Sequence, residues 1–133
     1  MDLLLGIEAS FILYASVDGI ISRIKKYIEV GAVHLNENYR GIDPDLIFGT
    51  IAFGENLKMY YYLNRYNFSG WNEIDIIVPR DDRIKSLKLA VKMTIKYNQL
   101  AERLIKNKNV IDKNLKGYHF ADNIDLITDL LFK

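Results

Sequence analysis

Cysteine is absent from this chain of 133 residues, and proline occurs only twice. Without cysteine there is no disulfide, no thiolate ligand for zinc and no cysteine nucleophile, a composition typical of a reducing compartment. We therefore expect a cytoplasmic protein. The chain also has no internal repeat, no low-complexity tract and no linker rich in Gly, Pro or Ser, which predicts a single globular domain over residues 1–133.

Long apolar runs are scarce as well. The strongest one, residues 3–17, is interrupted by Glu8 and followed by Asp18, whereas a membrane-spanning helix needs about 20 consecutive apolar residues. No basic stretch precedes the run, as a secretory signal would require. We therefore expect a buried helix here and no membrane partner.

What the chain does have is helical periodicity. Half of its residues are hydrophobic, and over most of the length they recur every three or four positions, as on one face of a helix. The pattern predicts a mainly α fold, a small helical bundle around one long central helix. We expect helices over residues 2–16, 17–30, 44–64, 81–107 and from 122 onward, with loops at 36–41 and 108–117. The clearest start signal is Asp43-Pro44, because aspartate caps free amides and proline suits the first helical position.

Residues 60–78 leave two alternatives open. Aromatic and β-branched residues are frequent there, which favours strands, and residues 67–70 form a plausible turn between two such stretches. A β-hairpin and a helix–loop–helix both fit the pattern, because short apolar runs do not distinguish them. In either case Pro79 ends the segment.

The charge of the chain is unevenly distributed. Residues 80–118 carry 11 basic and 4 acidic side chains, although the whole chain has a net charge of only +1. At about 100° per residue, six cations of the expected long helix fall within a sector of roughly 80°, and we expect the rest of that helix to be mostly buried. These cations are Lys85, Lys88, Lys92, Lys96, Arg103 and Lys106. They form either a solvated face or, because no acidic residue shares the sector, a track for nucleic-acid phosphates.

Aromatic residues cluster in a second segment. Six residues there are of types that are enriched in protein interfaces or that stack on bases: Tyr60, Tyr61, Tyr62, Arg65, Phe68 and Trp71. Three consecutive tyrosines cannot all face one core, so at least one should reach the surface. The preferred hypothesis is a non-enzymatic interaction protein, which self-associates or serves as a subunit of a larger assembly. Nucleic-acid binding along the cationic sector is the alternative.

Candidate catalytic residues are few. The chain contains no Gly-rich phosphate loop and no nucleophile elbow. Each of its two histidines, His34 and His119, lacks a second ligand at helical spacing, so we assign no metal site, no cofactor and no catalytic residue. Whether the protein is an enzyme stays open, with a binding role favoured.

Two short resemblances nevertheless concern chemistry. Lys113-Asn114 followed by His119 resembles the Arg-Asn…His motif of HEPN ribonucleases, with lysine replacing arginine and Gly117 where that family continues a helix. The resemblance implies a small helical dimer in which His119 acts on the 2′-hydroxyl or leaving group while Asn114 and Lys113 steer the phosphate.

The second resemblance involves two acidic residues. Glu73 and Asp75 are similar to the acidic strand of nucleotidyltransferases, which hold magnesium between two carboxylates, although the Gly-Ser signature that precedes that strand is missing. Two residues apart on a strand, both carboxylates would lie on one face. Any half-exposed strand has the same alternation of acidic and aliphatic residues.

Overall fold

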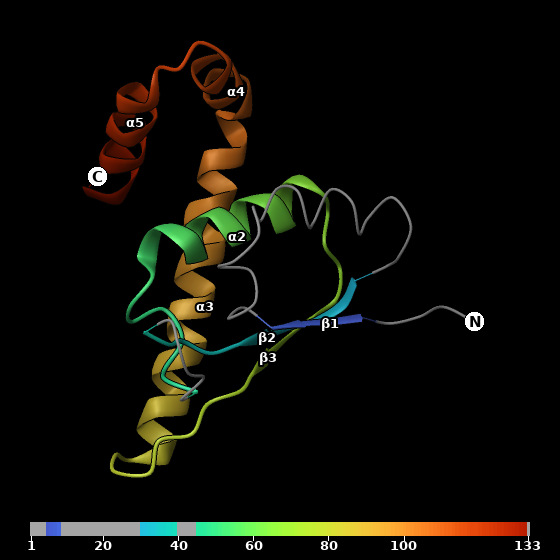
Figure 1. Ribbon diagram of the computed structural model, residues 1–133, viewed down its shortest axis with the longest axis vertical. Helices are drawn as coiled ribbons and strands as arrows, with labels where there is room; N and C mark the ends of the chain where they lie inside the picture. Colours follow the sequence, from blue (N-terminus) through green and yellow to red (C-terminus); the bar gives the residue numbers. More distant parts are fainter. Residues whose placement is uncertain (1–4, 9–29, 40–44, 133) are drawn as a thin grey trace.

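The computed structural model describes residues 5–8, 30–39 and 45–132. The described helices and strands are β1 (Leu5–Glu8), β2 (Val30–Leu35), α2 (Phe53–Arg65), β3 (Trp71–Ile74), α3 (Arg83–Lys106), α4 (Lys108–Lys116) and α5 (Phe120–Phe132). Helix α3 runs along the longest dimension of the molecule, α2 crosses it, and α5 returns beside its upper half (Figure 1). This arrangement confirms the predicted mainly α fold around one long central helix.

Helix α3 is continuous over 24 residues, which corresponds to a length of roughly 36 Å at the usual rise per residue. Its start is capped by Asp82, whose carboxylate accepts a hydrogen bond of 3.0 Å from the backbone amide of Lys85. The loop expected after Asn107 is wrong, because residues 108–116 form helix α4. Neither α3 nor any other described helix is long and apolar enough to cross a membrane.

The three strands form one parallel sheet in the order β1-β2-β3. Parallel neighbours require a crossover connection, which α2 provides between β2 and β3. All three strands therefore end at the same edge of the sheet. In the β2–β3 register His34 lies opposite Glu73, so these polar residues meet near that edge.

The sheet corrects the expectations for residues 5–8 and 60–78. Residues 5–8 form a strand where the apolar spacing predicts a helix, and residues 30–35, just after the expected end of the second helix, form β2. Over residues 60–78 neither alternative is right, because residues 60–65 complete α2 and residues 71–74 form β3 beside β2. Contacts with partners remote in sequence override local propensity in such short segments. Residues 9–29 and the Asp43-Pro44 start signal lie outside the described residues.

The core lies between α2, α3 and β2. Its buried hydrophobic residues are Val33, Leu35, Phe48, Leu57, Met59, Tyr60, Tyr61, Leu63, Ala90, Tyr97, Leu100, Ala101 and Leu104. The ring of Tyr97 stacks on Tyr60 at a centroid distance of 6.3 Å and meets Phe48 at 5.6 Å. The Tyr97 hydroxyl donates a hydrogen bond of 3.2 Å to the carbonyl of Gly49, so the buried polar end of this ring is satisfied.

A buried carboxylate holds the start of α2. Residues 45–52 were expected to be helical but are not: Leu46 pairs with Glu37 in an isolated antiparallel β-bridge, and a turn follows at residues 48–49. The N-cap residue Ala52 has no side-chain cap of its own. Glu37, which follows β2 and is only 3% exposed, accepts hydrogen bonds from the backbone amides of Gly49 (3.0 Å) and Ala52 (3.3 Å). It also accepts one from the side-chain amide of Asn56. Because an anion is favoured at a helix N-terminus, Glu37 performs the capping role from outside the helix.

Candidate interaction surfaces

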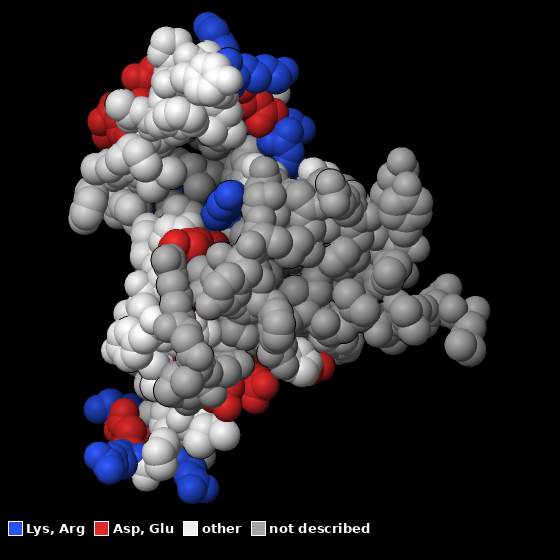
Figure 2. Space-filling model, in the orientation of Figure 1, with Lys and Arg blue, Asp and Glu red and all other residues white. Residues whose placement is uncertain are grey.

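The six cations of the predicted row are all exposed on α3. Figure 2 shows basic side chains around the lower end of the molecule, where α3 begins, and acidic ones on α5 at the upper left. Arg103 is already engaged within the chain, because its Nη1 donates a hydrogen bond of 3.3 Å to the carbonyl of Leu130 on α5. The four lysines of the row from Lys85 to Lys96 come before Arg103 along α3, and thus before its contact with α5.

The expectation that α3 is buried over most of its circumference is wrong. Only the face that contacts α2, β3 and α5 is covered, and its buried residues include Ala90, Tyr97 and Leu104. Five large apolar residues between Ile84 and Ile95 are exposed, by 63% at Ile84 and by 50% at Ile95. With spacings of three and four residues, four of them form one line along the helix, here named the α3 strip: Ile84, Leu87, Val91 and Ile95.

The predicted aromatic interface is divided by the fold. Tyr60 and Tyr61 are buried in the core, whereas Tyr62 and Phe68 are half-buried. Trp71, at the start of β3, is 77% exposed. The Tyr60 hydroxyl donates a hydrogen bond of 3.1 Å to the Asn72 side chain, and burial raises the pKa of Tyr60 above its ordinary value. Tyr60 and Tyr61 are therefore held inside the molecule, and Trp71 is the most accessible member of the cluster.

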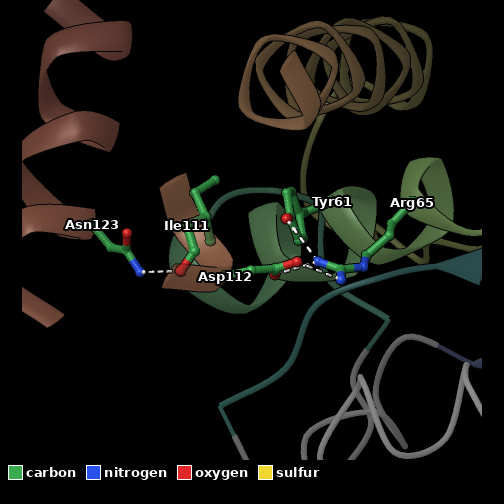
Figure 3. A network of polar contacts seen from close by, with 5 residues as sticks. All are labelled: Tyr61, Arg65, Ile111, Asp112 and Asn123. Atoms are coloured by element: carbon green, nitrogen blue, oxygen red, sulfur yellow. Dashed lines mark hydrogen bonds and ion pairs between the residues drawn. The ribbon is translucent and has the colours of Figure 1, made fainter. Parts of the chain in front are cut away.

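Arg65, the sixth residue of that cluster, links two helices. Its guanidinium donates to both carboxylate oxygens of Asp112 on α4, at 2.6 and 2.8 Å, and to the Tyr61 hydroxyl at 3.1 Å (Figure 3). These hydrogen bonds hold the pKa of Asp112 below its ordinary value. The bidentate pair fixes the end of α2 against α4.

An apolar groove opens between α2, α4 and α5, with a volume of about 610 Å³. Figure 2 shows the hollow beside α5. Its apolar lining includes Leu57 from α2, Leu115 from α4, and Phe120, Ile124 and Leu131 from α5. The three α5 residues are exposed. The volume would suit a small ligand, and the lining includes the polar side chains of Lys58, Asn123 and Thr128, but most of its exposed surface is apolar.

The connection between α4 and α5 explains why the sequence did not indicate the groove. The Asn114 side-chain amide donates a hydrogen bond of 2.9 Å to the side chain of Asn123. The Asn123 side-chain amide donates in turn to the carbonyl of Ile111 at 3.4 Å (Figure 3). These contacts hold α5 beside a segment that was expected to be a loop. The spacing of Phe120, Ile124 and Leu131 does predict an apolar helix face, but nothing local identifies what lies opposite.

The HEPN-like residues lie around this same connection. The side chain of Asn114 is bonded to Asn123, and the backbone amide of His119 donates a hydrogen bond of 2.8 Å to the Asn114 carbonyl. The His119 ring lies against Gly117, where an added Cβ would approach its Cδ2 to 2.5 Å. Asn114 thus has a structural role in joining α4 to α5.

Glu73 of β3 and Asp75, which comes directly after the strand, lie beside a histidine at the edge of the sheet. His34 Nε2 is 3.0 Å from Glu73 Oε2, and His34 Nδ1 is 3.7 Å from Asp75 Oδ2. Both carboxylates thus lie on one side of the strand, as the spacing predicts, but they face different ring nitrogens. Neither this group nor any other His, Asp or Glu cluster among the described residues has the arrangement that could hold a metal ion.

The described part of the chain therefore offers two exposed apolar surfaces, the α3 strip and the groove, and one row of cations. The chain matches no protein-family model and none of the curated proteins.

Proposed function

We propose that this protein is a non-enzymatic helical interaction protein that associates with further copies of itself. The observation that carries the proposal is the apolar groove, which leaves Phe120, Ile124 and Leu131 in water. Monomeric soluble proteins rarely expose large contiguous apolar patches, and burying such a side chain completely is worth about 1.5–3 kcal/mol. Covering the groove is therefore a strong driving force for association.

A protein fits this groove better than a small polar ligand. Helices α2, α4 and α5 form most of its walls, and Leu104 of α3 also lies in the lining. An amphipathic helix that enters such a groove buries apolar side chains spaced three and four residues apart. The chain itself carries a surface of this kind, the α3 strip. Both halves of an apolar contact are thus present on one polypeptide, which supports self-association over dependence on a foreign partner.

The test compares two isoleucines of equal exposure. Ile124 in the groove is 62% exposed, and Ile77, which does not line the groove, is 60% exposed. We expect the wild-type mass measured by sedimentation to rise above that of a monomer as concentration increases. Ile124→Gln should shift this rise to about tenfold higher concentration, because roughly 1.4 kcal/mol of burial is lost.

The matched variant Ile77→Gln should leave the association curve unchanged. Both substitutions affect exposed side chains, so circular dichroism and urea unfolding should match the wild type. A wild-type protein that stays monomeric at all accessible concentrations would rule out the proposal. An equal effect of the two variants would place the contact elsewhere.

A second candidate function is the binding of nucleic-acid phosphates along α3. It is supported by the exposure of all six cations and by the lack of an acidic residue within their sector. Retardation of nucleic acid in a gel at low salt should decline steeply as salt is added, and the triple variant Lys88→Glu, Lys92→Glu, Lys96→Glu should abolish it. Absence of retardation by the wild type at low salt would end this hypothesis.

A further inference from the structure

We propose that the α3 strip of one copy occupies the apolar groove of the next, so that copies join head to tail. This inference rests on the self-association proposed above and names the two surfaces that meet.

The two surfaces match in chemistry and in form. The strip is a narrow line of four branched apolar side chains on a straight helix, from Ile84 to Ile95. The groove presents Leu57, Leu115 and Ile124 from three different helices, so a fourth helix laid between them would find apolar contacts on both flanks. Their union removes both exposed apolar surfaces from water in a single contact.

The charges that border the two surfaces are opposite in sign. Beside the strip α3 carries Lys88 and Lys92, and beside Ile124 α5 carries Asp125, all of them exposed. At about 100° per residue, and with each helix viewed from its N-terminus, the charged side chains lie clockwise of the apolar row on both helices. When two helices pack antiparallel, the flanks that lie clockwise of the contact face each other. An antiparallel contact of α3 with α5 therefore places the lysines on the same side as Asp125.

The same geometry disfavours the simplest symmetric alternative. If two α3 strips packed antiparallel across a two-fold axis, each row containing Lys88 and Lys92 would lie beside its own copy. Like charges held next to each other across an interface are destabilising. An acidic partner helix removes this repulsion, and α5 is an acidic amphipathic helix on the same chain.

The positions of the two surfaces determine the symmetry. Leu104, the α3 residue in the groove, lies roughly 150° around the helix from the centre of the strip. It also belongs to the second half of α3, whereas the strip occupies the first half. Because the surfaces lie on opposite sides and opposite ends of α3, one partner cannot engage both. The contact is heterologous, and repetition gives open chains or closed rings.

A complementation experiment tests this arrangement. Val91→Glu places a charge in the strip, and Ile124→Glu places one in the groove; both positions are exposed, so folding should be retained. Each variant alone should be monomeric, because burying an unpaired carboxylate in an apolar contact weakens it by about 100-fold or more. Mixed in equal amounts, the variants should form a dimer with one intact junction and nothing larger. Ile77→Glu serves as the control and should assemble as the wild type does.

The outcomes separate this inference from the proposed function. A wild type that remains monomeric contradicts self-association itself. A wild type that associates, combined with a mixture that stays monomeric, contradicts only the head-to-tail contact. A wild-type assembly that stops at a dimer and is lost in both the variants and their mixture indicates a two-fold contact, which also overturns the inference.

The orientation of the helices has its own test. Lys88→Glu should weaken association several-fold, and more strongly at low salt, because rim charges act mainly through screened attraction. The added variant Asp125→Lys should restore the lost affinity if the helices are antiparallel. Failure of the exchanged pair to recover affinity, with the fold intact, would contradict the antiparallel arrangement.

Discussion

Glu37→Gln exchanges one oxygen of a buried side chain for an amide group that donates hydrogen bonds and cannot accept them. Three donors converge on the carboxylate: the backbone amides of Gly49 and Ala52 and the side chain of Asn56. A glutamine oxygen can accept two of these, so at least one buried donor is left facing another donor. An unsatisfied buried donor costs about 1–3 kcal/mol, and the loss of charge assistance adds about 1 kcal/mol, so we expect a loss of about 2–4 kcal/mol.

Urea unfolding followed by circular dichroism measures this loss as a lower midpoint with an unchanged slope. The control is Glu102→Gln on the exposed side of α3, where the new side chain keeps an oxygen that can accept the hydrogen bond from Asn98. That control should stay within about 0.5 kcal/mol of the wild type. If Glu37→Gln also stayed within that limit, the carboxylate would not hold the start of α2.

Gly49→Ala should lower the free energy of unfolding by about 2–4 kcal/mol, because Gly49 has a φ of 83° and an added Cβ would lie 2.7 Å from a ring carbon of Tyr97. Gly54→Ala, where the added carbon meets nothing within 4 Å, should not lower stability in the same urea titration, and equal losses would refute the reasoning. Asp112→Asn should cost about 1 kcal/mol at neutral pH, since its pair with Arg65 is partly exposed to water. Because the pKa of Asp112 is lowered in the folded state, this stabilisation is present above the ordinary pKa of 3.8 and is lost as the pH falls further. The unfolding free energies of wild type and variant should therefore converge in acid, and a constant difference between them would contradict the assignment. Burial raises the pKa of Tyr97 to about 12, so the contribution of Tyr97 to stability is lost as the pH rises from 10 through that value. A spectroscopic titration of the wild type, compared with that of Tyr97→Phe, measures the ionisation of this tyrosine. Ionisation of Tyr97 near pH 10 in the folded protein would contradict the prediction.

Helix α3 could be predicted because its signals are local. Asp82 caps its first turn, and no proline or glycine interrupts residues 83–106. The angular position of Lys88 and Lys92 follows from the same local geometry. The sequence could not predict which apolar residues of α3 are covered. Val91 and Leu104 both belong to apolar rows at helical spacing, but tertiary contacts bury Leu104 and leave Val91 exposed.

The candidate surfaces required the fold. Tyr60 and Tyr61 belong to a type that is common at interfaces, yet α2 turns both toward the core. The groove exists only because α4 is helical and Asn123 holds α5 beside it, and neither fact is visible in the composition of residues 107–117.

The mainly α character, the one long helix and the row of cations along it follow from local sequence, because each depends on the spacing of neighbouring residues. The parallel pairing of the strands, the start of α2 at Phe53 and the apolar residues left in water follow only from the fold. Those features depend on contacts such as the one between Glu37 and Ala52, whose partners are separated along the chain and meet only when it folds.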